Sequence, residues 1–231
     1  MVSYIKTFVK GFDKELGGGI PYGHLVLISG SPGTMKSTLA YSIMYNNVIK
    51  SNMSGAYISL EQSAPSLTFH LNQAGFKTSH AVKDKVQIID LAKIRKELKE
   101  DPKKDWLDVL KLYLEYLVKE NDYDILIIDS LPVVEIMAKM KDRRSDLFYF
   151  FEWLRDLSVT TFMIIETSEG DKGLSEEEFL ADGIIDMSMK VMGDIDVQRR
   201  VRCVKMRGAH HNMCYFSLEF KKGVFKIAPA I

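Results

Sequence analysis

The sequence lacks several features that would point to a secreted, membrane-inserted or nucleic-acid-binding protein. Its 231 residues include two cysteines, too few for a disulfide framework, and no apolar run long enough to span a bilayer. Thirty-one basic residues balance 31 acidic ones, so the global charge signature of a nucleic-acid binder is absent. The first residues do not resemble a signal peptide. We therefore expect a soluble, cytoplasmic protein without membrane insertion, for which nucleic acid is not the expected partner.

The chain also lacks internal repeats, low-complexity tracts and linkers rich in proline, glycine or serine. Hydrophobic residues make up 46% of the composition and charged residues 27%, which is typical of a globular protein. A chain of this length can bury a substantial core. We expect a single domain over residues 1–231.

Strand-like and helix-like segments alternate along most of the chain, which is typical of a mainly parallel sheet with helices on both faces. The expected strands lie at residues 25–28, 56–60, 86–89, 125–128 and 161–165. The expected helices begin near Thr38 or lie at residues 65–74, 105–120 and 142–157. After Gly183, further strand-like runs follow at residues 184–191, 200–207, 213–220 and 224–227. We expect these last strands to be antiparallel and to extend an α/β sheet at one edge.

Residues 30–37 carry the clearest chemical signal. They read Gly-Ser-Pro-Gly-Thr-Met-Lys-Ser between an apolar run and an amphipathic one, the strand–loop–helix layout of a phosphate-binding loop or Walker A motif. In such a loop, backbone N–H groups and the positive end of the new helix face the phosphates. Lys36 would reach the β- and γ-phosphates, and the Ser37 hydroxyl would hold Mg²⁺. The residues predicted to contact the nucleotide here are Gly30, Ser31, Pro32, Gly33, Thr34, Met35, Lys36, Ser37 and Thr38.

One position of this motif is unusual. Met35 stands directly before the lysine, where the consensus has glycine. Methionine is harmless there if its backbone φ is negative, and costly if φ is positive or if the backbone must touch the nucleotide. The alternative interpretation of the whole segment is an ordinary strand-to-helix turn that contains glycine, lysine and serine.

Acidic residues follow several strands, at the sheet edge where open α/β proteins bind ligands. Asp129 ends a buried apolar run and is predicted to hold the Mg²⁺ shell, although a residue there could merely cap the next turn. Glu61 is predicted to orient and deprotonate the attacking water, although by itself it would be an exposed loop acid. Three further residues close another strand and could sense the γ-phosphate or contribute nothing: Glu166, Ser168 and Glu169.

Together these residues resemble the KaiC-like branch of the RecA superfamily of ATPases, over nearly the whole chain. The matching segments are residues 11–13, 16–21, 30–37, 59–61, 127–130, 181–183 and 205–211. The last of them reads Lys-Met-Arg-Gly-Ala-His-His and is the most specific. Lysine, any residue, arginine, glycine and a histidine three places later are typical of KaiC-like domains, whereas DNA recombinases of the superfamily differ there.

The resemblance implies a RecA-like P-loop NTPase core that binds ATP and Mg²⁺ at the interfaces of a ring, usually a hexamer. It also implies that Lys205 and Arg207 act in trans, on the γ-phosphate held by the next subunit, and that His211 lies near the ribose or base. Met206, between the two cations, is included among the predicted nucleotide contacts. An arginine supplied from outside would stabilise the charge that spreads over the phosphate oxygens. A solvated face of an edge strand is the alternative for Lys205 and Arg207.

Two departures from the family pattern point to slow turnover. Family members with robust hydrolysis commonly have paired glutamates after the second core strand, whereas Glu61 is followed here by Gln62. Glutamine can orient water but cannot accept its proton. Met35 is the second departure. The chain also carries one ATPase domain where the circadian clock protein carries two, so a clock or autokinase role does not follow.

Three functions stay open on the sequence. The first is an ATP-hydrolysing, ring-forming enzyme. The second is a non-hydrolysing nucleotide-dependent switch or scaffold, similar to the archaellum-associated KaiC-like protein, in which nucleotide occupancy controls docking of an unknown protein partner. The third is a DNA-recombination accessory ATPase, against which the neutral charge and residues 205–211 both count.

Overall fold

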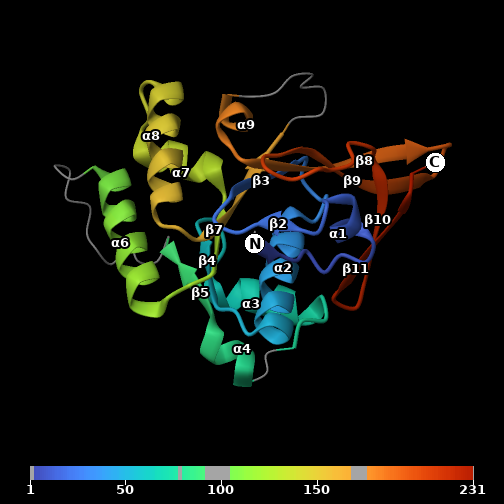
Figure 1. The fold of residues 1–231 in the computed structure, drawn as a ribbon, viewed down its shortest axis with the longest axis horizontal. Coiled ribbons are helices and arrows are strands. Elements are labelled where there is room, and N and C mark those ends of the chain that lie inside the picture. Colours follow the sequence, from blue (N-terminus) through green and yellow to red (C-terminus); the bar gives the residue numbers. More distant parts are fainter. Residues whose placement is uncertain (1–2, 78–79, 92–104, 168–175, 231) are drawn as a thin grey trace.

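The computed structural model describes residues 3–77, 80–91, 105–167 and 176–230. They surround one large sheet, with strand order β11-β10-β9-β8-β3-β7-β6-β4-β5 (Figure 1). Its strands are β3 (Leu25–Gly30), β4 (Gly55–Ser59), β5 (Val86–Asp90), β6 (Ile125–Asp129), β7 (Thr160–Glu166), β8 (Gly183–Met192), β9 (Asp196–Met206), β10 (Phe216–Lys221) and β11 (Val224–Pro229). The strands from β8 to β5 in this order are parallel, and β9, β10 and β11 extend one edge in antiparallel fashion.

Two apolar cores lie on opposite faces of the sheet, because successive side chains of a strand point to opposite sides. On β3, Val26 and Ile28 enter one core, whereas Leu25 and Leu27 enter the other. The helices of the first face are α1 (Phe12–Glu15), α2 (Lys36–Ser51) and α3 (Ala64–Gln73). Those of the second face are α6 (Trp106–Asn121), α7 (Leu131–Ala138) and α8 (Arg143–Asp156). The remaining short elements are β1 (Tyr4–Ile5), β2 (Ile20–Pro21), α4 (His80–Lys85) and α9 (Glu176–Leu180).

This arrangement confirms the expected fold class. The expected elements differ from the observed ones mainly at their ends, whereas α1, α4, α7, α9, β1 and β2 have no counterpart among the elements expected from the sequence. The expected strand at residues 213–220 begins three residues later, at Phe216. The backbone N–H of Cys214 donates to the side chain of Asn212 at 2.9 Å, and this local turn delays the strand. The strand expected at 200–207 begins earlier, at Asp196, because it pairs with β8 along a long hairpin.

Side-chain caps mark the start of several helices, but not of α2. Ser63 accepts a hydrogen bond from the N–H of Ser66 ahead of α3, and Asp105 accepts one from Leu107 ahead of α6. The residue before α2 is Met35, which provides no such cap. The first N–H groups of α2 therefore lack an acceptor from the capping residue, which leaves them available to an anion.

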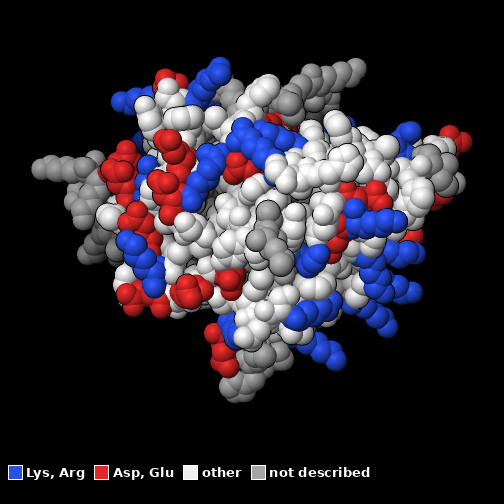
Figure 2. Space-filling model, viewed as in Figure 1, with Lys and Arg blue, Asp and Glu red and all other residues white. Residues whose placement is uncertain are grey.

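Charged side chains of both signs share the surface. Figure 2 shows acidic and basic side chains intermixed over α6 and α8, with basic side chains also gathered beside β10 and β11. No helix among the described residues combines the length and the apolar character that a bilayer crossing requires.

Candidate nucleotide site

The predicted phosphate loop connects the end of β3 to the start of α2. Gly30, the last residue of β3, has a φ of 152°, and a Cβ there would lie 2.1 Å from the carbonyl oxygen of Met187. Glycine is therefore required by the close approach of β8. Within the loop, the hydroxyl of the buried Thr34 donates to the carbonyl oxygen of Ser31 at 2.8 Å and closes the turn.

Met35 adopts the costly conformation considered in the sequence analysis. Its φ is 76° and its ψ is 31°, in the left-handed region. A side chain in this region costs about 1–2 kcal/mol, which explains why the consensus has glycine at this position. The Met35 side chain is half-buried, packs against the first core and also contributes to the wall of the pocket described below.

The Lys36 ammonium is held by the loop itself. Nζ donates to the carbonyl oxygens of Gly30 and Ser31, at 2.8 and 3.0 Å. Burial lowers the pKa of Lys36, and the carboxylates of Glu166, Asp129 and Glu61 partly oppose that shift. A nucleotide phosphate would give the buried Lys36 an anionic partner. The Mg²⁺ that accompanies the phosphate would offset the negative charge of the nearby carboxylates.

Three oxygen-bearing side chains lie close together next to the loop, those of Ser37, Asp129 and Tyr57. The Tyr57 hydroxyl donates to Oδ2 of Asp129, and the Ser37 hydroxyl lies near enough to both side chains to influence their pKa values. Burial raises the pKa of Asp129, although the hydrogen bonds from Tyr57 and Ser37 act in the opposite direction. A hydroxyl beside a carboxylate supplies the hard oxygen ligands that Mg²⁺ prefers, so the donor set fits this ion.

Glu61 follows β4 and is oriented by a neighbour. The Ser130 hydroxyl donates to Oε1 of Glu61 at 2.6 Å. The next residue, Gln62, forms a local turn, because its N–H donates to the Ser59 hydroxyl at 3.2 Å. Both Glu61 and Gln62 are exposed.

A cavity of about 290 Å³ unites most of these residues. Its wall includes the predicted site residues Pro32, Gly33, Met35, Lys36, Ser37, Thr38, Glu61 and Asp129. Gln62 and Glu166 also line it. Glu166 is there because it ends β7 directly beside Gly30, whereas Ser168 and Glu169 lie outside the described residues.

The predicted trans-acting cations lie at the other end of the same strands. Gly30 of β3 pairs with Met187 of β8, whereas Val26 pairs with Gly183, and Gly183 in turn pairs with Met206. Four residues of strand separate these positions, or about 13 Å along the sheet. The structure therefore does not bring Lys205 and Arg207 into the cavity of their own chain.

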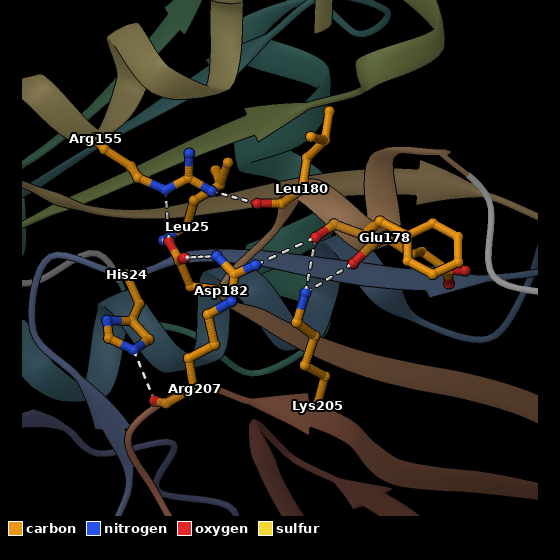
Figure 3. Close-up of polar contacts among 9 residues, drawn as sticks. His24, Leu25, Arg155, Glu178, Leu180, Asp182, Lys205 and Arg207 are labelled. Carbon is orange, nitrogen blue, oxygen red and sulfur yellow. Dashed lines mark hydrogen bonds and ion pairs between the residues drawn. The ribbon is translucent and has the colours of Figure 1, made fainter. Parts of the chain in front are cut away.

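Lys205 and Arg207 instead contact the C-terminal end of α9 (Figure 3). Lys205 Nζ donates to the carbonyl oxygens of Glu178 and Phe179, at 3.2 and 3.0 Å. Arg207 forms an ion pair with Asp182 at 2.9 Å. Its Nη2 also approaches the carbonyl oxygen of Phe179, at 3.4 Å.

Asp182 is the centre of this group. It accepts hydrogen bonds from the N–H of Leu25 at 3.1 Å and from Nε of Arg155 at 3.0 Å, in addition to its pair with Arg207. Burial alone would raise the pKa of Asp182, but the bonds from Arg155, Leu25 and Arg207 outweigh it and hold that pKa below its ordinary value.

Met206 and His211 occupy different surroundings. The Met206 side chain is 3% exposed and packs against Gly183, so its predicted nucleotide contact would fall to its main chain. His211 is half-buried, and its Nδ1 lies 3.4 Å from the carbonyl oxygen of Ala209. Its Nε2 is buried without a hydrogen-bond partner in the described part of the chain. The predicted roles of both residues stay predictions.

Three residues, which lie near the phosphate loop or in the group around Asp182, had no role assigned from the sequence. Tyr57 resembles any aromatic residue of a buried strand, and only the position of its hydroxyl makes it notable. Arg199 donates to the carbonyl oxygen of Gly33 at 3.4 Å from β9, a contact that depends on the pairing of β8 with β9. Asp182 stands in a segment that the resemblance identified, but its two arginine partners come from distant positions.

Comparison with known proteins gives a consistent result. A family model described as "ATPase: KaiC" matches residues 5–230. The circadian clock protein KaiC2 of Synechocystis sp. is 26% identical over 228 residues, which cover 96% of this chain and 39% of that protein. A UPF0273 protein of Thermotoga maritima is 30% identical over 222 residues, which cover 92% of this chain and 90% of the relative. This chain thus spans well under half of the clock protein but most of the shorter relative.

A solved structure agrees. The KaiC-like protein of the hyperthermophilic archaeon Pyrococcus horikoshii OT3 superposes with a TM-score of 0.83 at 25% sequence identity. The superposition covers 99% of this chain and 100% of that one. The similarity of fold therefore includes the segments that carry the cavity and the group around Asp182.

Proposed function

Since the chain belongs to the KaiC family of ATPases, we propose that it binds MgATP at the phosphate loop and hydrolyses it slowly between the subunits of a hexameric ring. The observation that carries this proposal is the cavity in which Lys36, Ser37 and Asp129 meet Glu61. These four groups have the three roles that γ-phosphate hydrolysis requires: a cation, two Mg²⁺ ligands and a base.

The chemistry follows from these groups. Lys36 would bind the phosphates, and Ser37 and Asp129 would hold Mg²⁺, which when bound neutralises charge on the phosphate oxygens. Glu61, oriented by Ser130, would accept the proton of the attacking water while the bond between the γ-phosphorus and the ADP oxygen breaks. Gln62 beside it cannot take a proton, and this supports slow turnover.

The separation of the two clusters supports the trans role of Lys205 and Arg207. Within one chain these cations lie at the opposite end of the strands from the phosphate loop, about 13 Å away along the sheet. A head-to-tail neighbour would bring them to the γ-phosphate of the next subunit. Arg207 is the better placed of the two, because its side chain is 53% exposed.

The hydrolysis proposal is tested by replacing Glu61 with glutamine. Phosphate release by the wild type should be slow and Mg²⁺-dependent, and Glu61→Gln should lower it about 100-fold or more while ATP still binds. Glu219→Gln is the matched control, since Glu219 is exposed on β10 and away from the cavity. A wild-type protein that binds no ATP in the presence of Mg²⁺ would refute the proposal.

A nucleotide-dependent switch is the second candidate. The exposed Gln62 in the cavity wall favours it, because hydrolysis is not needed if occupancy alone controls docking of a partner protein. In that case the wild type and Glu61→Gln would bind ATP equally tightly and release phosphate equally poorly. Both candidates treat residues 1–231 as one ATPase domain, and the cytoplasmic location expected from the sequence stays a prediction.

A further inference from the structure

Tyr57 lies in the interior of the sheet rather than at its ligand-binding edge. It is the middle residue of β4, pairs with Ile127 of β6 and Ile88 of β5, and has no exposed surface. Its ring belongs to the first core and lies 6.3 Å from the ring of Tyr41. The aromatic ring fills this position in the core, and phenylalanine would supply the same ring.

The hydroxyl is what distinguishes this residue. A buried hydroxyl costs free energy unless it finds a hydrogen-bond partner, so a tyrosine in the core needs a reason for its oxygen. The Tyr57 hydroxyl donates to Asp129, and the Ser37 hydroxyl lies nearby, so both of these polar neighbours are predicted Mg²⁺ ligands. The hydroxyl thus reaches from the core to the underside of the proposed metal site.

We propose that Tyr57 is a positioning residue for Mg²⁺, whose hydroxyl fixes one carboxylate oxygen of Asp129 and leaves the other oxygen for the cation. This inference rests on the proposed function. Without the hydroxyl, the Asp129 carboxylate would have to lose rotational freedom when the ion binds. Loss of such a supporting hydrogen bond typically weakens metal binding about 10- to 100-fold.

The test compares Tyr57→Phe with Tyr41→Phe. Tyr41 is the matched control, because it is equally aromatic, only 5% exposed and part of the same core, and no carboxylate contributes to its pKa. For each protein, the affinity for a fluorescent ATP analogue is measured in EDTA and across a Mg²⁺ titration. Thermal unfolding is measured in parallel.

The expected result is selective. Tyr57→Phe should keep the wild-type affinity in EDTA and raise the Mg²⁺ concentration for half-maximal effect at least about tenfold, whereas Tyr41→Phe should leave this midpoint unchanged. An unchanged midpoint in Tyr57→Phe would overturn the inference alone. A loss of affinity in EDTA together with lower thermal stability than Tyr41→Phe would also overturn it, since the role would then be structural. A wild type that binds no nucleotide would overturn the proposed function as well.

Discussion

At the scale of single residues, Met35 has two roles that favour different amino acids. Its left-handed backbone shapes the phosphate loop, and its side chain covers part of the first core. Glycine would satisfy the first role and lose the second. The loop therefore tolerates strain where most phosphate loops have none.

This balance can be measured by comparing Met35→Gly with Met35→Ala. Both variants lose the thioether, but only glycine relieves the left-handed strain, so it should be the more stable by about 0.5–1 kcal/mol. Urea unfolding gives the difference. The same pair of substitutions at Leu112, exposed in the middle of α6, should show the opposite order, because alanine is favoured in a helix. Equal stabilities at residue 35 would show that the strain is absent.

Much of the site could be predicted at this scale, because the chemistry depends on residue types at short spacing. Residues 30–37 predict the phosphate loop by themselves, and Asp129 and Glu61 follow from the strands that they end. The conformation of Met35 could not be predicted, since its φ depends on how the loop closes over Lys36. The contact of the Tyr57 hydroxyl with Asp129 could not be predicted either, because 72 residues separate the two in the sequence.

At the scale of elements, the short helix α9 is held by three cations, one from α8 and two at or directly after the end of β9. Lys205, Arg207 and Arg155 donate to the carbonyl oxygens of Glu178, Phe179 and Leu180 at its C-terminal end. Positive charge is favourable there because these carbonyl oxygens have no partner within the helix. Asp182 forms ion pairs with two of the three cations, Arg155 and Arg207.

Asp182→Asn should therefore destabilise the protein in a pH-dependent way. The lowered pKa of Asp182 means that the carboxylate contributes stability above its ordinary value of 3.8, and that this contribution is lost as pH falls through the lower folded value. The substitution should cost about 1–3 kcal/mol near neutral pH, with a smaller difference at about pH 3. Urea unfolding at both pH values measures it. Glu219→Gln, in an exposed ion pair, should show little change at either pH.

The elements themselves were largely predictable, since apolar runs and helical periodicity marked them. The end of α9 was not, because its contacts come from β9 and α8 rather than from its own sequence. The long β8–β9 hairpin was expected only in part. The outer end of β9, from Asp196 to Arg199, has a single apolar residue, Val197, and is exposed apart from the half-buried Gln198, so no alternation of apolar residues marks it as a strand.

At the scale of the whole molecule, the cavity and the cation cluster face opposite ends of one sheet. The proposed ring can be tested by mixing two inactive variants. Lys36→Ala would lack the proposed phosphate-binding lysine, and Arg207→Ala would lack the proposed trans cation. In mixed rings, about a quarter of the interfaces would join an intact loop to an intact Arg207, so mixing should restore a corresponding part of the activity.

The control is a mixture of Lys36→Ala with Glu61→Gln. Both residues serve the same cavity, so no interface in this mixture is complete, and activity should stay absent. Solution mass is measured with and without ATP alongside both mixtures. A protein that stays monomeric at saturating nucleotide, or a Lys36→Ala and Arg207→Ala mixture that gains nothing, would contradict the trans role.

The placement of donor and acceptor at opposite ends of the sheet makes any such assembly directional. Each subunit would give a cation cluster to one neighbour and receive one from the other. In an open linear assembly, complete catalytic sites number one fewer than the subunits, because the nucleotide site of one terminal subunit has no neighbour to supply the cations. Ring closure would complete that last site. Nucleotide binding at every site and closure of the ring would therefore favour each other.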